Sequence, residues 1–130
     1  MQSIGSVDMQ SDDSLDDSLD DVNSETLRRA IAYIHEHAHE EVTATSIARA
    51  ACVTTRAVQL AFRRYLGTTP SAYLRKVRLD HAHRDLLSAA HTEDGTVTQI
   101  ASRWGFNHQG RFAAYYRQMY GQNPRQTMAR

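Results

Sequence analysis

Apolar side chains recur every three or four positions along most of the chain after residue 24, which is the spacing of amphipathic helices. No stretch shows the two-residue alternation typical of a half-buried strand. The pattern therefore predicts an all-α fold of seven helices. One apolar stripe is present twice, displaced by 54 residues, as Val58, Phe62 and Leu66 and then as Phe112, Tyr116 and Tyr120.

Residues that start and stop helices divide this pattern into segments. Side chains that can cap a helix N-terminus precede the predicted helices, at Ser24, Thr43, Thr54, Thr96 and Asn123. Gly67 and Gly121 follow the two matched stripes and predict helix ends there. Pro70 suits the first turn of a long linker helix over about 70–89, whose apolar stripe ends at Leu86 and Leu87.

Each matched stripe belongs to the longer helix of a unit made of a short helix, a turn and a longer helix. The two units are predicted over about 43–67 and about 96–121, with the turns CVT and WGFN. In the first short helix, Ile47 and Ala50 are predicted to face inward. Because this is the helix-turn-helix plan, we expect two such units within one domain over residues 25–130.

If the matched stripes pack inward, the opposite side of each longer helix points outward. In the first unit that side carries Thr55, Arg56, Gln59, Leu60 and Arg63. In the second it carries His108, Gln109, Gly110, Arg111, Ala114 and Arg117. Arginine pairs bidentately with guanine and glutamine with adenine in the major groove, which a recognition helix enters through its N-terminal residues. Both outward sides therefore predict contacts with DNA.

Three small residues, Gly110, Ala113 and Ala114, are unusual on the outward side of a helix, where Gly costs about 1 kcal/mol relative to Ala. They suit a surface that base edges or thymine methyl groups approach closely. The alternative is that they pack against another helix.

The charges are segregated although the formal net charge is zero. Residues 1–25 hold eight of the 15 acidic side chains and no Lys or Arg, which leaves 15 basic against 7 acidic residues, or +8, in the rest. A basic body favours a polyanionic partner. The repeat DDSLDDSLDD predicts that residues 1–24 are a disordered acidic tail or a linker.

With one cysteine and no long apolar run, the chain is expected to be soluble and cytoplasmic.

The stretches FRRYLGTTPSAYLRKVRLDHA and IASRWGFNHQGRFAAYYRQMYGQNP resemble the C-terminal DNA-binding domain of bacterial AraC/XylS-type transcription regulators. The resemblance covers about residues 25–130. It implies two recognition helices, held by the linker helix, that read successive major grooves of double-stranded DNA roughly 34 Å apart. It further implies RNA polymerase as a partner, no cofactor, association with the nucleoid, and an upstream effector-binding or dimerisation domain.

Residue roles follow from the resemblance by position. Base contacts are expected from Arg56, Gln59, Leu60, His108, Gln109, Arg111 and Ala114. Phosphate contacts are expected from Thr55, Arg63 and Arg117. Family members often carry long polar residues at the positions of Gly110 and Ala114, and phenylalanine at the position of Tyr116.

Other functions have weaker support in the residues. His35 and His39 are one helical turn apart beside Glu36 and Glu40, which is a spacing that can hold zinc, but no third ligand follows at a matching interval. No nucleophile has a paired base, and Cys52 is expected to pack as a small apolar group in a turn; catalysis is therefore not expected. The main alternative is a protein-interaction or autoinhibited module in which the acidic tail masks the basic face.

Overall fold

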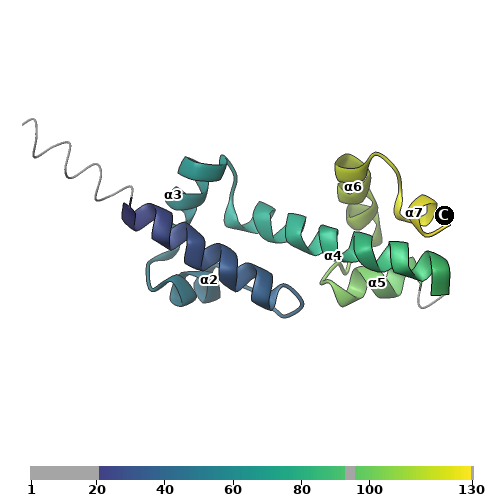
Figure 1. The fold of residues 1–130 in the computed structure, drawn as a ribbon, viewed down its shortest axis with the longest axis horizontal. Coiled ribbons are helices and arrows are strands. Elements are labelled where there is room, and N and C mark those ends of the chain that lie inside the picture. The colour runs from purple at the N-terminus through teal and green to yellow at the C-terminus, as the bar shows by residue number, and fades with distance from the viewer. Residues whose placement is uncertain (1–20, 93–95, 130) are drawn as a thin grey trace, which may run out of the picture. The chain divides into compact units, whose positions relative to one another are not determined.

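The computed structural model describes residues 21–92 and 96–129 (Figure 1). Within them the chain forms seven helices and no strand, which confirms the predicted all-α fold. They are a helix over residues 21–37, α2 (Ala44–Ala51), α3 (Thr55–Leu66), α4 (Pro70–Thr92), α5 (Val97–Arg103), α6 (Gln109–Tyr120) and α7 (Pro124–Met128). Residues 21–24, assigned to the acidic tail, are helical, so Ser24 lies inside the first helix and does not cap it.

The described chain divides into two compact units. Among the described residues, one unit combines 21–33 with Thr43–Pro70, and the other combines Ile34–Val42 with 71–92 and 96–129. Each unit contains one pair formed by a short and a longer helix, α2 with α3 and α5 with α6.

Side-chain caps begin these helices as the sequence predicts. Thr43 Oγ1 accepts a hydrogen bond from the Ser46 N–H at 3.0 Å, and Ser46 Oγ accepts one from the Thr43 N–H at 2.9 Å. Thr96 and Gln99 form the same reciprocal capping box at the start of α5. Since the first amides of a helix lack intrahelical partners, these bonds set where each short helix begins.

The core of the first unit lies between α2 and α3, which pack against each other. Its buried α3 side chains are Val58, Ala61 and Phe62, and its buried α2 side chains are Ile47, Ala48 and Ala51.

Two predicted core positions of this unit are wrong: Ala50 is exposed and Leu66 is 44% exposed. Residues four apart on a helix drift by about 40° per step, so Leu66 is rotated about 80° from Val58 and leaves the buried side.

The core of the second unit joins α4, α5 and α6. Its buried side chains are Leu79, Ala82, Leu86, Ala89, Ile100, Ala101, Phe112 and Tyr116. Leu87, which was expected in this core, is 40% exposed because it is about 100° around α4 from the buried Leu86.

Tyr116 carries a hydroxyl group into this core, with a relative exposure of 0%. The hydroxyl donates a hydrogen bond to Thr127 Oγ1 of α7 at 2.7 Å and lies 2.6 Å from His83 Nδ1 of α4. Gln122 Nε2 also donates to Thr127 Oγ1, at 2.8 Å. Because a buried hydroxyl must be hydrogen-bonded to offset its lost hydration, these contacts hold α4, α6 and α7 in one arrangement.

We predict that Tyr116→Phe lowers the free energy of unfolding by about 1–3 kcal/mol, because it leaves buried polar partners without the hydroxyl group. Urea denaturation followed by circular dichroism measures the change. Tyr115→Phe is the matched control, since the Tyr115 hydroxyl has no hydrogen-bond partner among the described residues. Equal stability of the two variants would contradict the structural role of the buried hydroxyl.

Candidate nucleic-acid interface

The turn before α3 is closed by the backbone and by one side chain. The Cys52 N–H donates to Arg49 O at 3.1 Å, the Val53 N–H donates to Ala48 O at 3.0 Å, and Thr54 Oγ1 accepts from the Ala57 N–H at 3.1 Å. Cys52 is exposed and has a left-handed backbone with φ of 61°. The expectation that Cys52 packs as an apolar residue is therefore wrong.

The side of α3 opposite its buried residues is exposed over its whole length. Thr55, Arg56, Gln59, Leu60 and Arg63 are all exposed, and Leu60 is 50% exposed although it is apolar. The predicted outward register of α3 is therefore confirmed.

The second unit reaches its longer helix through a turn that contains Gly105, whose φ of 84° lies in the left-handed region. His108 then caps α6, and its Nδ1 accepts a hydrogen bond from the Arg111 N–H at 3.1 Å. An imidazole that accepts at Nδ1 carries its proton on Nε2 when neutral. His108 is thus the cap that precedes α6, and its Nε2–H is oriented as a donor.

The side of α6 opposite Phe112 and Tyr116 is also exposed. It carries His108, Gln109, Gly110, Arg111, Ala114 and Arg117, as predicted. Gly110 and Ala114 are exposed, so they do not pack against another helix of the described chain, whereas Ala113 is half-buried and belongs partly to the packing side. Gln118, which the sequence reading missed, is exposed one turn beyond Ala114.

The arginines of these two outward sides differ from the arginines that pair with carboxylates elsewhere in the described chain. Within the described residues, none of Arg56, Arg63, Arg111 and Arg117 is ion-paired. By contrast, Arg28 and Arg29 pair with Glu25, and Arg103 pairs with Asp85 at 2.8 Å. Unpaired guanidinium groups on a helix side are available for bidentate contacts with base edges or phosphates.

Arg78 has a structural role through backbone carbonyls. Its Nε donates to Ala38 O at 2.9 Å and its Nη2 donates to Glu40 O at 2.7 Å. Burial lowers the pKa of the guanidinium group, although an arginine stays protonated. A Cβ added at Gly105 would lie 3.2 Å from Arg78 Nη1, so the turn before α6 fits closely over this side chain.

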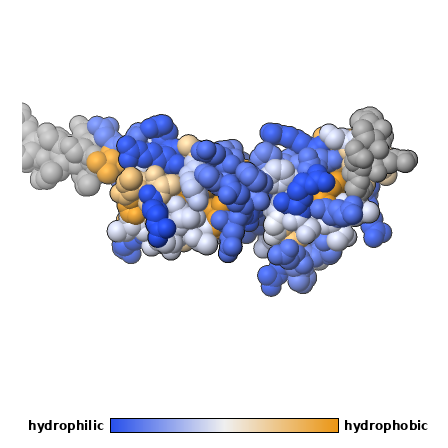
Figure 2. Space-filling model, turned by 90° about the horizontal axis from the view of Figure 1, so that it is seen from below, coloured by the Kyte–Doolittle hydropathy of each residue, from blue (hydrophilic) through white to orange (hydrophobic). Residues whose placement is uncertain are grey.

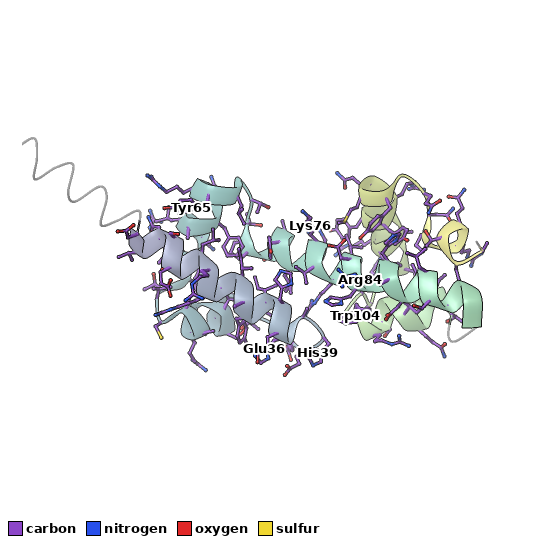
Figure 3. All side chains as sticks on the ribbon, viewed as in Figure 1. Glu36, His39, Tyr65, Lys76, Arg84 and Trp104 are labelled. Carbon is purple, nitrogen blue, oxygen red and sulfur yellow. The ribbon has the colours of Figure 1, made fainter. Side chains whose placement is uncertain are left out.

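Asp85 ties α4 to the end of α5. Its Oδ2 accepts from Arg103 Nη1 and from Trp104 Nε1, both at 2.8 Å. The Trp104 ring stacks on His81 with centroids 4.3 Å apart, and burial, with the positive charge of Arg84 second, lowers the pKa of His81 and favours the neutral ring. Trp104, labelled in Figure 3, therefore anchors the turn that precedes α6.

One face of the molecule is mostly hydrophilic, as expected of a surface that contacts water and charged molecules. The face shown in Figure 2 is mostly hydrophilic, and apolar surface is confined to small patches. None of the helices in the described chain has the length and hydropathy needed to cross a bilayer.

The histidines considered for zinc have other contacts. His35 Nε2 lies 3.0 Å from Tyr73 Oη, and His39 Nε2 lies 3.6 Å from Glu40 Oε2. Across residues 21–92 and 96–129, no three His, Cys, Asp or Glu side chains gather in a way that could hold a metal ion.

Comparison with known proteins identifies the family. A family model described as a helix-turn-helix domain matches residues 47–130. The probable thc operon regulatory protein of Rhodococcus erythropolis is 41% identical over 102 residues, covering 78% of this chain and 30% of that protein. XylDLEGF operon transcriptional activator 2 of Pseudomonas putida is 32% identical over 101 residues, covering 78% of this chain and 64% of that protein.

Solved structures similar to this chain indicate the same family as these sequence relatives. A probable AraC family transcriptional regulator from Rhodopseudomonas palustris is 35% identical, with a TM-score of 0.73 over 79% of this chain and 94% of that one. This chain belongs to the AraC/XylS family. Another AraC-like fold is the DNA-binding domain of AdpA, solved in complex with a target DNA, which is 27% identical with a TM-score of 0.66 over 79% of this chain and 89% of that one.

We predict that Gly105→Ala lowers the free energy of unfolding by about 1–3 kcal/mol, through left-handed backbone strain and contact with Arg78. Thermal and urea unfolding measure the loss. Gly121→Ala is the control in the same unit, because its φ is 77° but nothing lies within 4 Å of an added Cβ. A smaller loss for Gly105→Ala than for Gly121→Ala would show that Arg78 does not restrict the turn.

Proposed function

We propose that this AraC/XylS-family chain binds double-stranded DNA sequence-specifically, with α3 and α6 as its two recognition helices. The observation that carries the proposal is the repetition of an exposed helix side with unpaired arginines, one on each helix-turn-helix unit. The similar AdpA domain, solved in complex with a target DNA, supports DNA as the polyanion that this chain binds. The chain spans only 30% and 64% of the Rhodococcus and Pseudomonas regulators, so the proposal concerns the part present here.

The two recognition helices, α3 and α6, expose chemically different side chains. α3 presents the long polar side chains Arg56 and Gln59 near its N-terminus, together with the apolar Leu60, which suits a thymine methyl group. α6 presents Arg111 and Gln109 around small residues. Because the two sides differ, one chain suits an asymmetric DNA site.

Arg63 and Arg117 lie farther along their helices, and Thr55 is the first residue of α3; we assign all three to phosphates. We further propose that the chain acts in the cytoplasm, on the nucleoid, and that RNA polymerase is a partner. The names of the Pseudomonas relatives, operon transcriptional activators, support a role in transcription.

We predict that Arg56→Ala and Arg111→Ala each relax base preference at different positions of the selected site, by about 1–3 kcal/mol per lost bidentate contact. Selection from a random duplex library followed by sequencing measures both preferences. Arg29→Ala is the matched control, because this exposed arginine is already paired with Glu25. Loss of preference at overlapping positions would refute the assignment of two separate readers.

We predict that Arg117→Ala weakens binding to all sequences alike and reduces the slope of log affinity against log salt by about 1, as expected for one lost phosphate contact. Titrations at several salt concentrations, with selected and with random duplexes, measure both effects. Arg125→Ala is the control for Arg117→Ala, because it removes one positive charge from α7 of the same unit. An equal change of slope in both variants would mean that Arg117 acts only through net charge.

A further inference from the structure

A groove lies beside α6 in the second unit, between the first half of α4 and the second half of α6. It has a volume of about 260 Å³ and is lined by Arg75, Lys76 and Leu79 of α4 and by Tyr115, Gln118 and Met119 of α6. Two of these side chains are cationic and none of the groove's lining residues is acidic. The groove therefore suits an anion.

One of the two cations is held in a fixed orientation. The Arg75 guanidinium carbon lies 4.2 Å from the centroid of the Tyr115 ring, which is a cation–π contact. Arg75 is half-buried, and none of the described carboxylates is paired with it. A guanidinium group stacked on a ring loses less side-chain entropy when it binds a ligand, and stacking leaves the N–H groups at its edge able to donate hydrogen bonds.

The groove adjoins the outward side of α6. Gln118 lies four residues after Ala114, and Tyr115 lies four residues after Arg111, so each lies one helical turn along the same side. Tyr115 and Gln118 are thus both part of the groove and neighbours of the candidate base-contacting residues. Lys76 is exposed at the rim of the groove on α4 (Figure 3).

We propose that this groove binds a backbone phosphodiester of the DNA whose major groove α6 enters. Arg75 and Gln118 donate hydrogen bonds to the phosphate oxygens, and Lys76 contributes positive charge at the rim. A helix in the major groove is flanked by phosphates, and such contacts set its register without reading sequence. This inference rests on the proposed function, and it adds α4 to the DNA-contacting elements.

The test uses Arg75→Met, which removes the charge but keeps an unbranched side chain over Tyr115. We expect affinity for the selected duplex to fall about three- to tenfold at moderate salt, and the slope of log affinity against log salt to fall by about 1. Base preference in the library should stay unchanged. Urea midpoints within error of the unsubstituted protein show that the fold is intact.

Arg84→Met is the matched control on the same helix. Arg84 is exposed and lies nine residues after Arg75, which at about 100° per residue places it on the opposite side of α4. It removes the same charge and is expected to leave the slope nearly unchanged. An equal change of slope in Arg75→Met and Arg84→Met would overturn the proposal.

Methylphosphonate linkages, which neutralise single phosphates, locate the contact. One linkage beside the α6 half-site should weaken binding of the unsubstituted protein but have little further effect on Arg75→Met. Additive effects at every linkage would overturn the groove assignment while leaving the base-reading results intact. Failure to bind any duplex would instead overturn the proposed function as well.

Free inorganic phosphate is the alternative ligand for this groove, because it has the same anionic oxygens as a DNA phosphodiester. Inorganic phosphate is titrated without DNA while the Arg75 Nε–H signal is followed by NMR. We expect no saturation below tens of millimolar, because a phosphodiester fixed by α6 is far more concentrated at the groove than a free ion. Saturation at sub-millimolar phosphate, with DNA binding unaffected by Arg75→Met, would make this a small-anion site and overturn the proposal.

Discussion

Burial of aromatic side chains along one side of α3 and of α6 is the constraint on which the other features depend. Phe62 in one unit, and Phe112 with Tyr116 in the other, are fully buried. A helix can turn about its own axis only by exposing such side chains, and each would cost about 1.5–3 kcal/mol or more. Their burial therefore fixes which residues of each longer helix point outward.

Polar contacts then place the second longer helix more closely than apolar packing can. Apolar contacts are non-directional, whereas a hydrogen bond requires a defined distance and angle. Arg78 binds two backbone carbonyls beneath Gly105, and Asp85 holds both Arg103 and Trp104. The turn before α6 is thus anchored to α4 by side chains that do not belong to the helix-turn-helix unit itself. Such support is what a binding surface needs if its contacts are to be preorganised.

The sequence predicted the helices, most caps and the outward register of both longer helices, because periodicity and capping are local properties. The error at Leu66 occurs because a four-residue repeat drifts away from the buried side of α3. Ala50 and Leu87 are exposed because each is rotated by about 100° from a buried neighbour, Ala51 and Leu86. The partners of Arg78 could not be predicted, since backbone carbonyls near residue 40 leave no signal in the side-chain pattern.

The groove residues escaped prediction for a related reason. Arg75 and Gln118 are 43 positions apart, and only the packing of α4 beside α6 places them around one groove. Gln118 alone was accessible to sequence reasoning, as the residue one turn beyond Ala114 on the outward side of α6.

The difference between the two readers has a physical consequence. Gly110 and Ala114 cannot hydrogen-bond to base edges through their side chains, so hydrogen-bonded base reading in the second unit is left to His108, Gln109 and Arg111. Small side chains do, however, allow the helix backbone to approach the bases, which brings the flanking Arg111 and Arg117 nearer to the DNA. In the proposed complex, the small side chains of α6 therefore place more of the affinity of the second unit on arginines and on backbone phosphates. A phosphate contact from α4 fits that arrangement, because it adds affinity at the unit whose recognition helix carries the smaller side chains.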